Sequence, residues 1–378
     1  MRMTEYDVII MGAGPAGSTI ARLTASMGFR VGVLDRKKIL GVPLQCAGLI
    51  SHRITEANVL PDNLILNSVR GAVLHSPSGI KLRVSRKRPE AHVIDRTAYD
   101  QYLADLACEA GAELRTGTAV RDFSEATGEV EVNGRTLRAS VLVDARGQVA
   151  IRDKYPARQF LVRFRDQEMD TDFVDLRVDS RLSPGFLWRI PLDEKTARVG
   201  AFGHHKNLKD LIKGFISDLS TDFRIMESHH GFIPEPDPDM ELVGGRCIRI
   251  GDAAGQVKPT TGGGIVLASR AAHVAAEVIQ MALEDDMGLL ENYQEVCRKL
   301  YMAEMKNQMR VQRTFRILSD EDLDHIFLKM KEYGAEEIIS RYGDMDIQTP
   351  LIMEFLKSGL LFRIIPSIIS RKVASIWK

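Results

Sequence analysis

The stretch YDVIIMGAGPAG, residues 6–17, decides the fold, because an apolar run leads directly into a glycine loop. The apolar run predicts a buried parallel strand, and the residues after the loop repeat at helical spacing. In a GxGxxG loop the first glycine makes the tight turn, the second lets backbone approach a pyrophosphate, and the third lets helix and strand pack closely. The helix start adds unpaired N–H groups that favour an anion. We therefore expect a dinucleotide at this loop.

A carboxylate follows at the distance that such a site requires. The second predicted strand, VGVL, ends beside Asp35, which lies 23 residues beyond Gly12. An acid about 20 residues after the loop typically accepts a hydrogen bond from a ribose hydroxyl. This favours NAD or FAD over NADP. The alternative is a solvated carboxylate at a strand end.

A second strand–loop–helix unit lies much later in the chain. The stretch IRIGDAAG, residues 248–255, places Asp252 at the end of a buried strand, and KPTTGGGI follows at residues 258–265. Three successive glycines let backbone approach a planar ring or an anion without interference from side chains. The alternative, a merely flexible loop, does not account for the ordered sequence of strand, acid, glycine turn and helix.

These two units divide the chain. We predict an α/β protein in which residues 1–155 and 240–290 form a discontinuous Rossmann-like dinucleotide-binding domain. Short alternating segments at residues 156–239 predict an inserted antiparallel β-sheet that forms a wall over a ligand. Residues 291–378 are mostly helical in pattern and form a C-terminal region.

Composition excludes several classes of function. Lysine plus arginine balances aspartate plus glutamate at 51 each, so no overall field favours nucleic acid. Four cysteines lie far apart without a CxxC pair, and the adjacent histidines at 204–205 and 229–230 lack metal-ligand spacing, so we expect no metal. The N-terminal apolar run is too short for a signal peptide, and no run approaches the ~20 apolar residues of a membrane span. We expect a cytoplasmic protein with free thiols.

The order of these motifs resembles the FAD-dependent oxidoreductases of the para-hydroxybenzoate hydroxylase fold. The matching features are GAGPAG, the Asp35-Arg36 pair, Arg96 at the head of its helix, VDARG at residues 143–147, and GDAAG with its glycine-rich follower. The resemblance implies bound FAD, and Arg146 departs from the family by replacing a frequent acid. The implied cofactor contacts are Gly12, Gly14, Ala16 and Gly17 at the pyrophosphate, Asp35 and Arg36, Arg96, Val120 by the adenine, Asp252 at the ribityl chain, and Gly263, Gly264 and Ile265 at the isoalloxazine.

Two further stretches resemble the geranylgeranyl reductase branch of that fold. LQCAGLIS, residues 44–51, is similar to the family's cysteine-glycine stretch along the flavin, which implies cofactor contacts at Cys46, Ala47 and Gly48. SPGFLWRIP, residues 183–191, is similar to its P-x-x-Y-x-W-x-F-P segment, which lines an isoprenoid pocket. The segment retains Trp188 and Pro191, whereas Ser183, Phe186 and Ile190 are substituted. The resemblance implies substrate contacts at Phe186, Trp188 and Ile190, which share one face of a strand.

The resemblance implies an FAD-dependent reductase that saturates carbon–carbon double bonds in geranylgeranyl (polyprenyl) chains of archaeal-type ether lipid precursors. Cys46 is the candidate for tuning the flavin or supplying a proton, although it could equally be a buried small hydrophobic residue, and Trp188 could be ordinary core. Ferredoxin, a deazaflavin and NAD(P)H all stay open as electron donors. An FAD-dependent monooxygenase or flavin halogenase is the main alternative, because FLWRIP also resembles the halogenase W-x-W-x-I-P signature. A non-catalytic flavin- or lipid-binding protein is the third.

The C-terminal segment from Leu351 to Lys378 differs in composition from the rest of the chain. It is apolar, with five basic residues and one acid, for a net charge of +4. Such a segment can lie in a membrane interface with its cations at the headgroups. We expect peripheral contact with the cytoplasmic membrane face, and the alternative is a pair of helices packed on the core. Pro366 breaks any continuous helix there.

Overall fold

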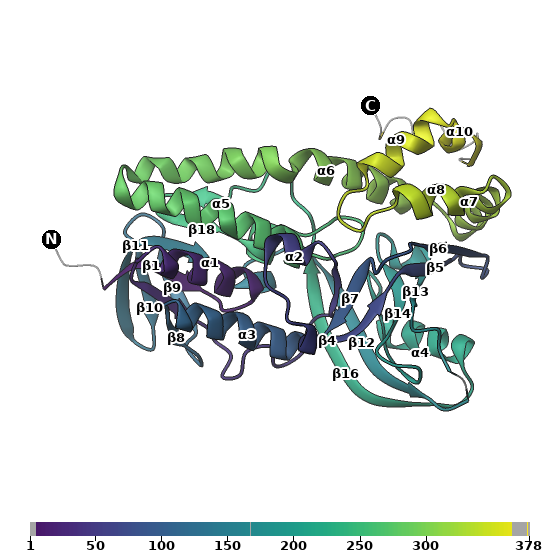
Figure 1. Ribbon diagram of the computed structural model, residues 1–378, viewed down its shortest axis with the longest axis horizontal. Helices are drawn as coiled ribbons and strands as arrows, with labels where there is room; N and C mark the ends of the chain where they lie inside the picture. Colours follow the sequence, from purple (N-terminus) through teal and green to yellow (C-terminus); the bar gives the residue numbers. More distant parts are fainter. Residues whose placement is uncertain (1–4, 167, 365–375, 377–378) are drawn as a thin grey trace.

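The computed structural model describes residues 5–166, 168–364 and 376. Figure 1 shows one sheet with its covering helices at one end of the molecule, a second large sheet at the other end, and the last helices above that second sheet. The predicted fold class is confirmed by this arrangement and by the structural match reported below. Of the segment from Leu351 onward, residues 365–375, 377 and 378 lie outside the described part of the chain.

The first sheet is built around the opening apolar run. Its main strands lie in the order β17 (Val243–Gly244), β18 (Cys247–Arg249), β11 (Arg135–Asp144), β1 (Tyr6–Met11), β2 (Val31–Leu34) and β8 (Glu113–Arg115). β1 pairs in parallel with both β11 and β2.

Both faces of β1 are covered, which explains why the run is continuously apolar. Val8 and Ile10 pack toward the helices, whereas Ile9 and Met11 pack toward the β9–β10 hairpin. The helices are α1 (Pro15–Ser26), α3 (Arg96–Glu109), α5 (Ile265–Glu284) and α6 (Asn292–Arg316), and the hairpin strands are β9 (Val120–Ser124) and β10 (Glu129–Val132).

The second sheet contains seven strands. Their order is β16 (Phe223–Pro234), β12 (Lys154–Phe164), β15 (Thr196–Phe202), β14 (Phe186–Pro191), β13 (Phe173–Val178), β5 (Gly71–His75) and β6 (Lys81–Ser85). β5 and β6 come from the segment that the sequence assigned to the nucleotide domain, and β13 joins β5 in parallel. Helix α4 (Leu208–Leu219) packs its apolar side on one face of this sheet, which leaves the other face to line a cavity.

Smaller elements connect the two sheets. A three-stranded sheet is formed by β3 (Leu49–Ser51), β7 (Ala91–Ile94) and β4 (Ile65–Val69), and α2 (Ile54–Ala57) follows β3. The C-terminal helices are α7 (Asp320–Glu332), α8 (Ala335–Tyr342), α9 (Thr349–Lys357) and α10 (Leu360–Ile364). In Figure 1 the yellow helices α7 and α8 lie beside β5 and β6.

One helix among the described residues, α5, is long and apolar enough to cross a membrane. Its composition has a simpler cause, because it lies between α1 and α6 and buries ten of its residues in the largest core cluster or beside it. Leu360 and Ile364 of α10 are also buried, against Ala335 of α8. The described part of the C-terminal segment therefore includes helix packed on the protein.

Candidate functional site

A cavity of about 470 Å³ lies between the two large sheets. Most residues predicted to bind cofactor or substrate line it. They are Gly12, Gly14, Ala16, Asp35, Arg36, Cys46, Ala47, Arg96, Val120, Phe186, Trp188, Ile190, Asp252, Gly263, Gly264 and Ile265. Gly17 and Gly48 lie behind this lining and support it, for the steric reasons given below.

The three glycines of the loop have different roles: two allow close packing of the backbone, and one faces the cavity. A Cβ on Gly12 would meet the carbonyl oxygen of Ala145 at 2.3 Å, and one on Gly17 would meet the carbonyl oxygen of Gly12 at 1.9 Å. A Cβ on Gly14 would meet nothing within 4 Å. Gly12 and Gly17 therefore let the chain pack closely, whereas Gly14 borders open cavity.

The start of helix α1 suits an anion. The helix begins at Pro15, its first turn contains no acid, and no side chain caps its free N–H groups. These donors and the positive end of the helix dipole remain available to a phosphate. Together with Gly14, they fit the pyrophosphate of a dinucleotide.

Asp35 has a structural role besides the predicted one. One carboxylate oxygen accepts the Ala13 N–H at 2.7 Å, and the other accepts the Lys37 N–H at 2.7 Å. These bonds tie the glycine loop to the end of β2. Each oxygen retains a second lone pair, so the carboxylate can still accept a ribose hydroxyl.

Asp252 is a half-buried residue of the cavity wall whose carboxyl group has no hydrogen-bond partner among the described residues. Burial raises the pKa of Asp252, and the Arg96 guanidinium only partly offsets this. The Arg96 guanidinium is itself held by Asp100, at 2.8 and 3.1 Å. Burial opposes the Arg96 charge, but Asp100 and Cys46 outweigh it and leave the pKa of Arg96 above its usual value.

The glycine-rich loop before α5 completes a site that fits FAD. A Cβ on Gly264 would lie 2.9 Å from the Gln256 carbonyl oxygen and 3.4 Å from a carboxylate oxygen of Asp252. The nearby Thr261 hydroxyl is buried and has no hydrogen-bond partner. An unpaired hydroxyl, an unpaired carboxyl and a side-chain-free backbone surface together suit a polar chain that ends in a planar ring.

The cysteine-glycine stretch is positioned by the second sheet. Gln159 on β12 donates its amide N–H to the Cys46 carbonyl oxygen at 2.9 Å, and Arg198 on β15 donates to the Ala47 carbonyl oxygen at 2.8 Å. Gly48 has a φ of +73°, and a Cβ there would lie 2.2 Å from the Arg198 guanidinium. Gly48 therefore accommodates Arg198 and is not part of the cavity lining. The Cys46 thiol accepts the Gly48 N–H at 3.4 Å and borders the cavity.

Strand β14 forms an apolar wall of the cavity, as predicted. Phe186, Trp188 and Ile190 line the cavity, whereas Leu187 packs with the α4 side of the sheet. Arg189 also points away from the cavity and bonds Asp175 at 2.7 Å. The Phe186 and Trp188 rings meet edge to face with centroids 6.2 Å apart. We call Phe186, Trp188 and Ile190 the β14 wall.

Comparison with known proteins assigns the family. Residues 7–363 match the lycopene cyclase protein family model. The chain is 30% identical to digeranylgeranylglycerophospholipid reductase 1 of Methanopyrus kandleri, over 77% of this chain and 85% of that protein. Because the match spans most of the chain, the protein belongs to the lycopene cyclase protein family.

Solved structures agree on the fold. A geranylgeranyl bacteriochlorophyll reductase-like protein from Thermoplasma acidophilum matches with a TM-score of 0.84 at 21% identity, over 98% of this chain and 99% of that chain. A flavin-dependent brominase matches with a TM-score of 0.66 at 17% identity, over 89% and 92%. The predicted membership of the geranylgeranyl reductase family and the predicted FAD cofactor are confirmed, and the chain is an FAD-dependent oxidoreductase.

Several cavity residues of this flavoprotein escaped the sequence analysis. The β14 wall is extended by Leu176, Phe202, Ile233 and Met345. Lys258 also lines the cavity, although KPTTGGGI was singled out only for its glycines. Alternation along β13 and β15 could have indicated Leu176 and Phe202, but no local pattern marks Met345.

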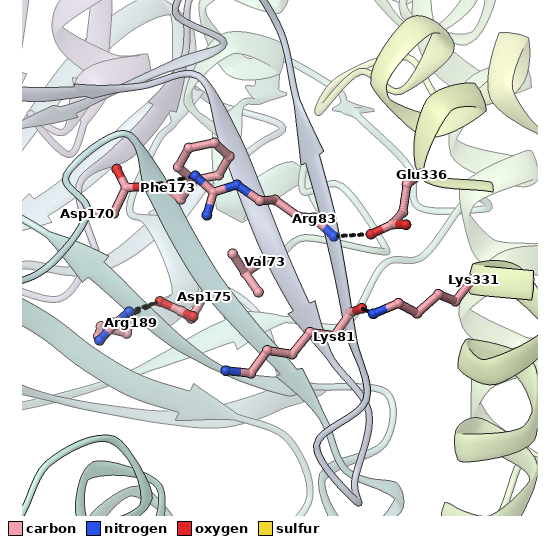
Figure 2. A pocket seen from close by; sticks show the side chains of 9 residues that line it. All are labelled: Val73, Lys81, Arg83, Asp170, Phe173, Asp175, Arg189, Lys331 and Glu336. Carbon is pink, nitrogen blue, oxygen red and sulfur yellow. Dashed lines mark hydrogen bonds and ion pairs between the residues drawn. The ribbon is translucent and has the colours of Figure 1, made fainter. Parts of the chain in front are cut away.

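A second pocket, of about 400 Å³, lies on the opposite face of the second sheet (Figure 2). Its charged groups mostly bind one another. Arg83 pairs with Asp170 at 2.8 Å and stacks over Phe173, while Lys331 of α7 donates to the Lys81 carbonyl oxygen at 3.2 Å. This pocket is a joint between the sheet and the C-terminal helices.

The histidines in the described parts of the chain do not form a metal-binding site with other side chains. No group of three or more His, Cys, Asp or Glu residues there is arranged to hold a metal ion. His204 and His205 lie in the turn after β15, which ends at Phe202, so they are not on a strand. His229 and His230 are on β16, and both line the cavity.

Proposed function

We propose that this flavoprotein saturates carbon–carbon double bonds of geranylgeranyl or related polyprenyl chains, in precursors of archaeal-type ether lipids. One observation supports this most strongly: the β14 wall and the glycine-rich flavin loop face the same cavity. The name of the M. kandleri relative points to the same class of lipid.

The protein's residues would act mainly by binding and by excluding water. Each buried methylene of a prenyl chain contributes about 0.8 kcal/mol, so an apolar wall can hold the substrate without hydrogen bonds to it. Bound FAD, once reduced, supplies the hydride. The β14 wall would keep the chain extended against the cofactor, and a substrate that fills the cavity between the two sheets would displace water from it.

The second hydrogen requires a proton at a defined atom. The Cys46 thiol is the candidate, because it borders the cavity within the stretch that Gln159 and Arg198 hold in place. Cys46→Ala should retain FAD and slow reduction of the prenyl chain. Unchanged turnover by the alanine variant would remove Cys46 from the mechanism.

An anaerobic assay tests the proposed function. The FAD-loaded protein is reduced chemically, mixed with a geranylgeranyl phospholipid, and the lipid is analysed by mass spectrometry for the gain of two hydrogens per double bond. Oxygen uptake that depends on an aromatic substrate would instead support the monooxygenase or halogenase alternative. Lipid binding without turnover would support a binding protein. Repeating the assay with ferredoxin, a reduced deazaflavin or NAD(P)H would identify the electron donor.

We also propose that the protein works in the cytoplasm, with peripheral contact to the membrane through the segment from Leu351 to Lys378. In its described part, Met353 and Lys357 of α9 are exposed, which suits an interface. The burial of Leu360 and Ile364 limits such contact to the outer side of α9 and to residues beyond α10.

A further inference from the structure

The segment of residues 343–348, between α8 and α9, brings the C-terminal region into the cavity. We call it the Met345 segment. Met345 lines the cavity and packs against the cluster that contains Trp188 and Ile190. Its backbone carbonyl oxygen accepts the Lys258 ammonium at 3.0 Å. Met345 therefore lies where the flavin loop meets the β14 wall.

Side chains from the FAD-binding part of the chain hold this segment on one side. Lys258 bonds Asp346 at 2.7 Å, and these two side chains are only 12% and 8% exposed. Arg53 donates to Asp344 at 2.9 and 3.1 Å. Thr260, in the flavin loop, accepts from Gln348 at 2.6 Å.

Residues of helix α6, and one residue that follows strand β6, hold the segment on the other side. Gln308 of α6 donates to the Asp346 carbonyl oxygen at 3.0 Å, and Glu304 accepts the Gln348 N–H at 2.7 Å. Arg86, just after β6, donates to the Gly343 carbonyl oxygen. A segment without regular structure is thus fixed by polar bonds on each side, which places the Met345 side chain reproducibly.

We propose that Met345 determines substrate specificity: its side chain limits how far a prenyl chain can advance past the β14 wall, and so which double bonds reach the flavin. This inference rests on the proposed function. Methionine is an unbranched, adaptable gap-filler in apolar sites. A shorter residue there would lengthen the apolar path, and a bulkier one would shorten it.

Two variants of opposite size test this inference in the FAD-loaded enzyme. Met345→Ala should shift the ratio of kcat/KM for a geranylgeranyl over a farnesyl substrate upward by about tenfold, and Met345→Phe should shift it downward, as expected for small volume changes in a hydrophobic pocket. The positions reduced in partly saturated products should move in the same order. Met281→Ala, at an exposed position of α5 outside the cavity lining, is the matched control and should leave the ratio unchanged.

A second readout does not depend on turnover. The chain has two tryptophans, so in a Trp377→Phe background the fluorescence of Trp188 reports lipid binding in the cavity. The affinity for saturated chains should increase with chain length until the cavity is full. In Met345→Ala this increase should continue to longer chains than in the parent protein. If wild type reduces prenyl lipids but the Met345 variants keep its length preference and product pattern, this inference fails and the proposed function stands. If wild type neither binds nor reduces prenyl lipids, both fail.

Discussion

Replacing Trp188 with alanine is the sharpest test of the apolar cavity. The side chain is only 8% exposed, packs against Phe186, and has a buried indole N–H without a hydrogen-bond partner. The exposed 8% of a tryptophan surface of about 250 Å² is about 20 Å². A prenyl chain that covers this area and buries an equal area of its own would gain about 1 kcal/mol, at ~25 cal/mol per Å². Losing that contact should lower kcat/KM for a prenyl substrate by about fivefold.

The same substitution also costs stability, so it needs a matched control. Truncating a buried tryptophan or phenylalanine to alanine typically costs about 3–5 kcal/mol. Phe215 is equally buried, at 2% exposure, but it packs from α4 onto the opposite face of the sheet. Phe215→Ala should therefore lose comparable stability and retain kcat/KM. Arg189→Ala, although it faces away from the cavity, is a poorer control because it would leave the buried Asp175 with one cation fewer.

The assay combines anaerobic steady-state kinetics with the visible spectrum of bound FAD, at a temperature below both melting transitions. Trp188→Ala should retain the flavin spectrum and reduce the prenyl substrate with a kcat/KM about fivefold below that of the wild type. The reasoning is refuted if Trp188→Ala keeps the wild-type kcat/KM, or if Phe215→Ala loses as much activity while still holding FAD.

Three further outcomes are expected. Gly14→Val should fold yet lose FAD by absorbance, since its side chain would enter open cavity, whereas Gly17→Ala should lower the melting temperature by clashing with backbone. Burial raises the pKa of Asp252, so ionisation destabilises the apo fold as pH rises above ~4. Apo Asp252→Asn should melt higher than wild type near neutrality and equally at pH ~4, while binding FAD about ten- to a hundredfold more weakly. Deleting residues 365–378 should reduce salt-sensitive binding to anionic liposomes; equal binding by a folded, FAD-loaded truncation would favour core packing.

The features that sequence predicted well are those encoded within one short stretch. The glycine loop, the strand before it and the helix after it depend on neighbouring residues, and their pattern has one structural solution. The β14 wall follows from the two-residue period of a strand. The Asn133–Gly134 turn between β10 and β11 is equally local, and both residues have positive φ as such a hairpin requires.

The features that sequence missed depend on pairing between distant segments. Residues 71–85 belong to the second sheet because β5 pairs in parallel with β13. The sequence of neither strand indicates which strand it will pair with. Met345 follows a helical, charged region whose own pattern indicates only solvent and core. Its place in the cavity depends on residues far away in the chain, such as Lys258, which lies 87 residues earlier and binds the Met345 carbonyl oxygen.

This difference has a consequence for the cysteine-glycine stretch. Resemblance identified Cys46, Ala47 and Gly48 by type, but their positions depend on Gln159 and Arg198, which lie 113 and 151 residues from the carbonyl groups that they bind. Arg198 is buried, and among the described residues its guanidinium hydrogen-bonds backbone carbonyl groups, of Ala47 and Ile94. Burial lowers the pKa of Arg198, so its charge is retained at a cost. A cation kept in that setting fixes the backbone of the cysteine-glycine stretch more firmly than a neutral donor would, since hydrogen bonds from charged donors are the stronger ones. The functional groups of the stretch therefore come from its own residues, whereas its position is fixed by Gln159 and Arg198 of the second sheet.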